Sequence, residues 1–129
     1  MESLLLEQSK STPFIRFDAV TGVCEIAGEC YPENAGKFFG PVLEWLKQYL
    51  TSESTHELQL NVHMNYFNSS SSKAFMNLFE LLEEFASAGR QVCVNWKFDS
   101  ENEPILEAGE EFREELSSVS FNLVAVSEG

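Results

Sequence analysis

Four consecutive serines at residues 69–72 stand between Asn68 and Lys73. A serine hydroxyl can accept a phosphate, which adds about −1.5 to −2 charges and three acceptor oxygens. A strand pattern precedes the serines and a helix pattern follows them, so they are expected at a helix N-terminus. Unpaired N–H groups and the helix dipole favour a phosphate there. On composition alone the serines predict only a helix-capping turn, although one cap does not need four of them.

Histidine could turn one of these serines into a nucleophile. His56 and His63 are the histidines of the chain, and His63 falls on the polar side of a strand. No cysteine or aspartate stands at a spacing that forces a catalytic dyad with His63. We interpret His63 as a surface or hydrogen-bonding residue. A hydrolase that uses His63 and a serine is kept as an alternative, and it would lose turnover on His63→Ala.

Metal and cofactor chemistry have little support in the sequence. Residues 99–103 resemble the start of a calcium loop, but Pro104 replaces the glycine that such a loop needs. The three cysteines have no metal-ligand spacing and are expected to be reduced core or sheet residues. The acidic run predicts a solvated helix face, or a face that meets a basic partner. Its members are Glu107, Glu110, Glu111, Glu114 and Glu115. We expect no catalytic residue, metal or cofactor.

Length and charge limit the classes of partner. The chain has 129 residues, which suits one domain over residues 1–129, and its net charge is −13. A surface of this charge repels phosphate backbones and anionic membranes, so nucleic acid and membrane are poor partners and basic proteins are better ones. No signal peptide or membrane span is recognisable, and a cytoplasmic location is expected.

Hydrophobic periodicity predicts the order β-β-α-β-α-β-α-β. Residues 1–12 are expected to be loose and residues 51–55 to form a polar loop. Asn34 is expected to cap the first helix, and Pro41 to kink that helix or split off its first turn. The expected strands cover residues 14–18, 23–30, 58–66, 91–99 and 120–126, and the helices cover residues 35–50, the serine cluster to Gly89, and 105–116.

The fold class that follows is α/β (α+β), with a mixed sheet and helices mainly on one face. The β-α-β units predict parallel neighbours joined by right-handed crossovers. Two middle strands alternate cleanly between apolar and polar residues, and the apolar set runs through Tyr66. A sheet covered on both faces would not alternate in this way. The uncovered face, which is either solvated or a docking surface, is expected to carry Gln59, Asn61, His63, Asn65, Asn95 and Lys97.

Six segments in order resemble the SiaC family of bacterial regulatory phosphoproteins. They are residues 31–35 (YPENA), 38–50 with Trp45, 68–73 (NSSSSK), 81–84 (LLEE), 89–92 (GRQV) leading to Trp96, and 110–112 (EEF). The resemblance spans nearly the whole chain after about residue 12 and implies a STAS-like fold, similar to anti-anti-sigma factors.

The resemblance also implies a partner-switching function. A cognate kinase would phosphorylate one hydroxyl at the strand-to-helix junction, and a PP2C-type phosphatase would remove the phosphate. The unmodified form would bind and activate a GGDEF diguanylate cyclase, which raises cyclic di-GMP and promotes biofilm formation or aggregation. A scaffold that binds its partner constitutively is the alternative.

The family's modified residue follows an asparagine and is usually threonine, and the matching position here is Ser69. The other candidates for modification are Ser70, Ser71 and Ser72. By the same resemblance, the residues that shape the site or bind the partner are Asn68, Ser70, Lys73, Tyr31, Glu33 and Asn34.

Overall fold

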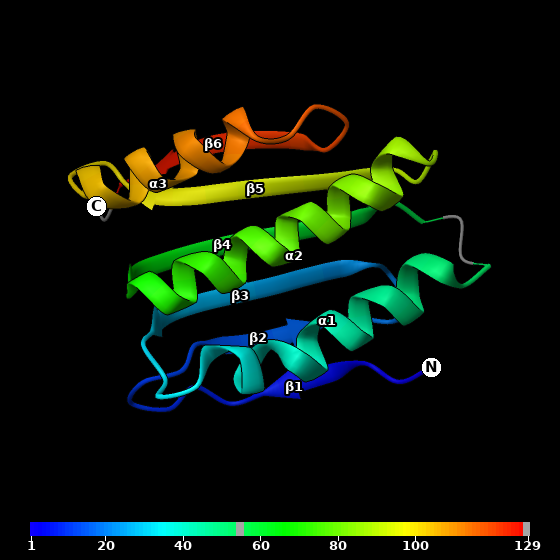
Figure 1. Ribbon diagram of the computed structural model, residues 1–129, viewed down its shortest axis with the longest axis horizontal. Helices are drawn as coiled ribbons and strands as arrows, with labels where there is room; N and C mark the ends of the chain where they lie inside the picture. Colours follow the sequence, from blue (N-terminus) through cyan, green and yellow to red (C-terminus); the bar gives the residue numbers. More distant parts are fainter. Residues whose placement is uncertain (54–55, 128–129) are drawn as a thin grey trace.

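A computed structural model describes residues 1–53 and 56–127 of the chain. Within these residues, three helices lie on one side of a six-stranded mixed sheet (Figure 1). The elements in chain order are β1 (Leu4–Leu6), β2 (Phe14–Phe17), β3 (Val23–Cys30), α1 (Ala35–Thr51), β4 (Leu58–Phe67), α2 (Ser69–Ser87), β5 (Val92–Asp99), α3 (Glu103–Glu114) and β6 (Ser120–Val126).

The strands lie in the order of the chain, β1-β2-β3-β4-β5-β6. β1, β2 and β3 pair antiparallel, whereas β3 to β6 are parallel. From β3 to β6, each strand is joined by a helix to the strand beside it, and every crossover advances across the sheet in the same direction. Because such crossovers are right-handed, all three helices must cover the same face. The predicted mixed sheet with helices on one face is therefore confirmed, and α1, α2 and α3 lie side by side over it (Figure 1).

Three local predictions need correction or fall partly outside the described residues. Residues 1–12 were expected to be loose, but Leu4–Leu6 form the edge strand β1, and the Trp45 indole N–H donates to the Glu2 carbonyl at 2.8 Å. α1 runs through Pro41 as one helix, so its first turn is not split off. The predicted polar loop at residues 51–55 includes 54 and 55, which lie outside the described residues.

A β-bulge near the end of β4 changes which side chains face the core. The pairing of β3 with β4 shifts by one residue between Gly28, opposite Met64, and Glu29, opposite Tyr66. The extra residue reverses the alternation beyond it, as bulges do. Tyr66 was expected on the apolar side, and this is wrong because its side chain is 52% exposed. Phe67 points into the core instead.

An aromatic cluster joins α2 and α3 to the sheet. Trp96 of β5 is fully buried, and its ring lies 5.4 Å from that of Phe112 on α3 and 6.0 Å from that of Phe75 on α2. The Trp96 indole N–H donates to the carbonyl of Ile105 at 2.8 Å. The first turn of α3 is thus fixed to β5 by a buried hydrogen bond as well as by apolar contact.

Three asparagines on the uncovered face of the sheet hydrogen-bond one another. Asn61, Asn95 and Asn122 lie in register on neighbouring strands. The Asn95 amide donates to Asn61 Oδ1 at 2.9 Å, and the Asn122 amide donates to Asn95 Oδ1 at 3.1 Å. This ladder gives the polar alternation a structural role. None of the helices among residues 1–53 and 56–127 is both long and apolar enough to cross a membrane.

Glu83 on α2 holds the turn between α3 and β6. Its carboxylate accepts hydrogen bonds from the backbone N–H groups of Ser117, Ser118 and Val119 and from the Ser117 hydroxyl, at 2.9 to 3.2 Å. Partial burial raises the pKa of Glu83, but these hydrogen bonds outweigh it, so the pKa lies below its usual value of 4.5. The ionised side chain therefore fixes α3 relative to α2.

We expect Glu83→Gln to lower the free energy of unfolding at neutral pH by about 1 kcal/mol, because hydrogen bonds to a charged acceptor are lost at a partly exposed site. A carboxylate whose pKa is depressed in the folded state contributes stability above pH 4.5. This stability is lost as the pH falls through the folded-state pKa. The difference in the free energy of unfolding between the native protein and the variant should therefore shrink as the pH falls. Urea unfolding at pH 7 and at about pH 3 measures this difference. Glu84→Gln, at an exposed neighbour, is the control, and an equal loss in both variants would contradict the prediction.

Candidate functional site

The carboxyl ends of β3, β4 and β5 lie at one edge of the sheet, because these strands are parallel. α2 begins at this edge. Asn68 is its N-cap, since its backbone is extended and its side chain accepts a hydrogen bond from the Ser71 N–H at 3.0 Å. The Asn68 N–H donates to the Cys30 carbonyl at the end of β3, at 3.1 Å. The serines are therefore the first residues of α2 and not its cap.

The four serines have different surroundings. Ser71 is fully buried. The Ser70 hydroxyl is exposed and donates to Asn68 Oδ1 at 3.3 Å, and Ser72 is half-buried. Ser69 is exposed, and its hydroxyl makes no hydrogen bond with any described residue. Ser69 thus combines access from solvent with a hydroxyl that has no structural role.

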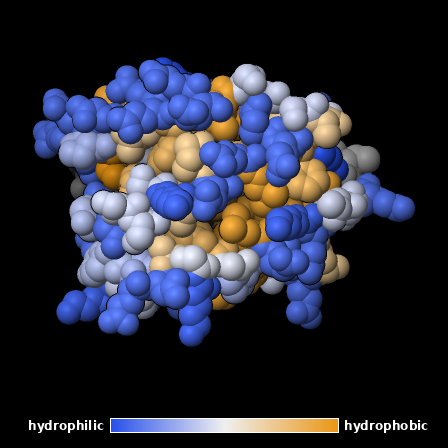
Figure 2. Space-filling model, in the orientation of Figure 1, coloured by the Kyte–Doolittle hydropathy of each residue, from blue (hydrophilic) through white to orange (hydrophobic). Residues whose placement is uncertain are grey.

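Ser69 lies at a groove of about 490 Å³ between α2 and α3. The α2 residues along it recur at helical spacing, so they share one face of that helix. Met76 and the buried Phe112 supply its apolar surface. On this face of the molecule, apolar surface is visible between hydrophilic side chains (Figure 2). The lining residues are Ser69, Ser72, Lys73, Met76, Glu80, Glu111, Phe112 and Glu115.

Tyr31, Glu33 and Asn34, which the family resemblance implies as partner-binding residues, occupy two separate places. Tyr31 follows β3, and its ring lies 6.1 Å from that of Tyr66, at the same sheet edge as the start of α2. The bulge in β4 turns Tyr66 toward this position. Glu33 and Asn34 instead line a separate cavity of about 740 Å³ beside β1 and α1. As predicted, Asn34 caps α1, with its side chain accepting from the Lys37 N–H at 3.0 Å.

His63 is not brought together with the serines. It follows the buried Val62 on β4 and is paired with Lys97 of β5, which places it on the face away from the helices. The serines belong to α2 on the opposite face. Burial raises the pKa of Cys24 to about 12 and also raises that of Cys30, so neither thiol is an activated nucleophile. Among the described residues, no three His, Cys, Asp or Glu side chains are grouped to hold a metal ion.

Comparison with known proteins gives one consistent result. The model of the SiaC family regulatory phosphoprotein matches residues 6–126. A Pseudomonas aeruginosa relative is 38% identical over 117 residues, covering 91% of this chain and 92% of the relative. The crystal structure of apo-SiaC from Pseudomonas aeruginosa superposes with a TM-score of 0.85 at 35% identity, covering 97% of this chain and 98% of SiaC.

A second solved structure contains a partner. It is the diguanylate cyclase SiaD in complex with its activator SiaC, also from Pseudomonas aeruginosa. The matching chain has a TM-score of 0.85 at 36% identity, with 97% of this chain and 99% of that chain covered. The family match and the solved relatives both extend over nearly the full length of this chain. The chain therefore belongs to the SiaC family of regulatory phosphoproteins.

Proposed function

We propose that this chain is a non-enzymatic partner switch, acting as a single domain in the cytoplasm. A cognate kinase phosphorylates Ser69, and a PP2C-type phosphatase reverses the modification. The unmodified protein binds and activates a GGDEF diguanylate cyclase and so raises cyclic di-GMP, which controls biofilm formation or aggregation.

The observation that carries the proposal is the exposed Ser69 hydroxyl at the start of α2, free of hydrogen bonds to described residues, in a chain of a regulatory phosphoprotein family. A phosphate there meets the positive end of the helix dipole, so the fold tolerates it. The principal effect of the phosphate is then on the surface that a partner meets. The activating complex between SiaC and the cyclase SiaD supports a diguanylate cyclase as that partner.

Two alternatives make different predictions. A constitutive scaffold would use the serines only to cap α2, but Asn68 supplies the cap. A hydrolase would need His63 close to a serine hydroxyl, and His63 lies on the opposite face of the sheet from α2. Both observations favour the switch over these alternatives.

Phosphate mapping tests the proposed site. We expect incubation with the cognate kinase and ATP to add one phosphate at Ser69, located by fragmentation mass spectrometry. Ser69→Ala should abolish this modification, whereas the matched Ser87→Ala, at an exposed serine near the end of the same helix, should leave it intact. Modification confined to residues outside 69–72 would defeat the assignment.

A further inference from the structure

The groove between α2 and α3 has an uneven distribution of charge along its length. Of the eight described residues that line it, Lys73 is the only cation, and it stands one helical turn from Ser69. Glu80, Glu111 and Glu115 are the anions. Glu111 on α3 and Glu115, the residue that caps the end of α3, are both exposed. One end of the groove is therefore basic at its surface, and the rest is acidic.

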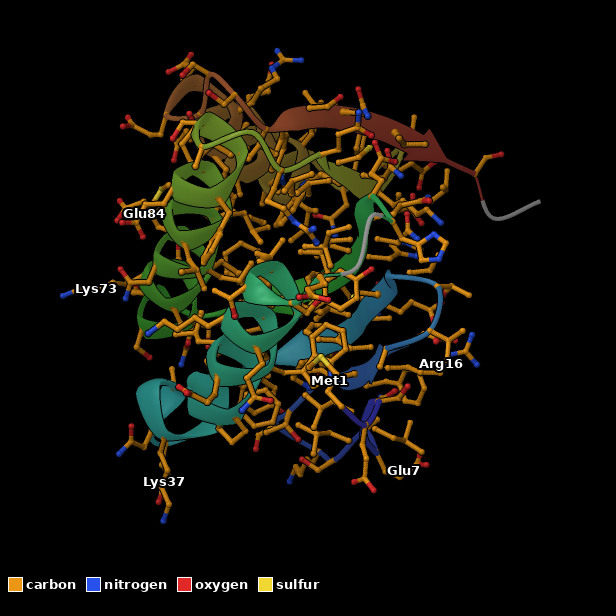
Figure 3. All side chains as sticks on the ribbon, turned by 90° about the vertical axis from the view of Figure 1, so that its right-hand side faces the viewer. Met1, Glu7, Arg16, Lys37, Lys73 and Glu84 are labelled. Atoms are coloured by element: carbon orange, nitrogen blue, oxygen red, sulfur yellow. The ribbon has the colours of Figure 1, made fainter. Side chains whose placement is uncertain are left out.

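Lys73 is free to bind a partner. Its side chain extends from α2 away from the sheet, on the opposite side of the molecule from Arg16 (Figure 3). It makes no ion pair with any residue in the described ranges. An exposed cation beside an apolar surface and three carboxylates is an arrangement that a partner of matching charge pattern recognises.

The direction of the proposed switch, in which phosphorylation weakens binding, indicates that pattern. If the partner were purely basic, a phosphate at Ser69 would add negative charge to an acidic groove and strengthen binding. An electrostatic weakening requires that the partner place an anionic group near Ser69, where Lys73 is the cation of the groove lining. A phosphate on Ser69 is within reach of Lys73, four residues further along the helix, and would compete for it.

We propose that this groove binds a segment of the cyclase that presents an acidic side chain to Lys73 and basic side chains to Glu111 and Glu115, with apolar contact on the half-buried Met76. This inference rests on the function proposed above and deepens it. Phosphate on Ser69 binds Lys73 and withdraws it from the acidic side chain of the partner, so Lys73 transmits the effect of modification to the interface.

The test is a thermodynamic cycle with the full-length cyclase, measured by calorimetry. Lys73→Glu should weaken binding at least about tenfold. Phosphorylation should weaken native binding to a similar extent but should weaken binding of Lys73→Ala by less than about threefold, because the group it competes for is gone. The matched control is Lys37→Glu at an exposed lysine of α1, which should bind as the native protein does.

The acidic side is tested by a charge-reversed pair. Glu111→Lys with Glu115→Lys should weaken binding about tenfold. Glu107→Lys with Glu110→Lys changes the net charge equally on the same helix but outside the groove, and should weaken binding much less. Equal losses in the two pairs would overturn the groove as the docking site.

The outcomes separate the two proposals. If the native protein binds the cyclase and phosphorylation weakens Lys73→Ala as strongly as it weakens native, the role of Lys73 is wrong and the switch stands. If the unmodified native protein does not bind the cyclase, both the proposed function and this inference are wrong.

Discussion

Ser69→Asp is expected to bind the diguanylate cyclase at least about tenfold more weakly than the native protein, while Ser69→Ala binds with nearly native affinity. The alanine variant removes a hydroxyl that makes no hydrogen bond with a described residue, so the fold and the groove surface are retained. The aspartate variant places a negative charge one turn from Lys73 and at the end of the groove. Affinity is measured by calorimetry, and cyclic di-GMP production provides the second measurement.

Ser87→Asp is the control for charge alone. It adds the same charge to the same helix, on an exposed serine near the other end of α2. It should leave affinity nearly unchanged. If Ser69→Asp, Ser69→Ala and the native protein bind equally well, there is no electrostatic gate at this position.

Gly109→Ala is expected to lower the free energy of unfolding by about 2 kcal/mol and the Tm by roughly 5–10 °C. A Cβ atom on Gly109 would lie 2.4 Å from Trp96 Cδ1 and 2.9 Å from Leu123 Cδ2. Trp96 cannot move aside, because it is fully buried and its indole N–H is bound to Ile105. α3 must therefore shift away from the sheet, which outweighs the better helix propensity of alanine.

The same shift should weaken cyclase binding, since α3 carries one wall of the groove. Gly40→Ala is the matched control, because Gly40 lies inside α1 and a Cβ there would meet no atom of another described element within 4 Å. It should change the free energy of unfolding by less than about 0.5 kcal/mol, because the better helix propensity of alanine is offset by contact of its Cβ with the ring of Pro41. Thermal and urea unfolding measure both variants, and a Gly109→Ala protein as stable as Gly40→Ala would contradict this account of α3.

Periodicity predicted the elements well where neighbouring residues alone decide the structure. Leu58, Leu60, Val62 and Met64 alternate with polar residues, and all four are buried. Tyr66 continues the same alternation in the sequence, but the bulge opposite β3 reverses it. A bulge depends on how two strands pair, so the spacing within β4 does not reveal it. β1 was missed for a related reason, since three leucines become a strand only when they pair with β2.

The candidate site was predicted in part. A serine cluster between a strand and a helix pattern places exposed hydroxyls at the start of α2, as expected. The sequence did not reveal that Asn68 makes the cap, that Ser71 is buried, or that α3 forms the second wall of a groove beside Ser69. That wall depends on Gly109 and Trp96. These residues belong to two different elements, α3 and β5, and meet only when α3 packs on β5.

The most direct measurement is the affinity of the native chain for the diguanylate cyclase in its two chemical states. The protein is phosphorylated by its kinase, and mass spectrometry confirms that the phosphate is on Ser69. Calorimetry then measures its affinity for the cyclase, before and after treatment with a PP2C-type phosphatase. We predict that phosphorylation weakens binding at least about tenfold and that dephosphorylation restores it. Equal affinity in both states would contradict the switch.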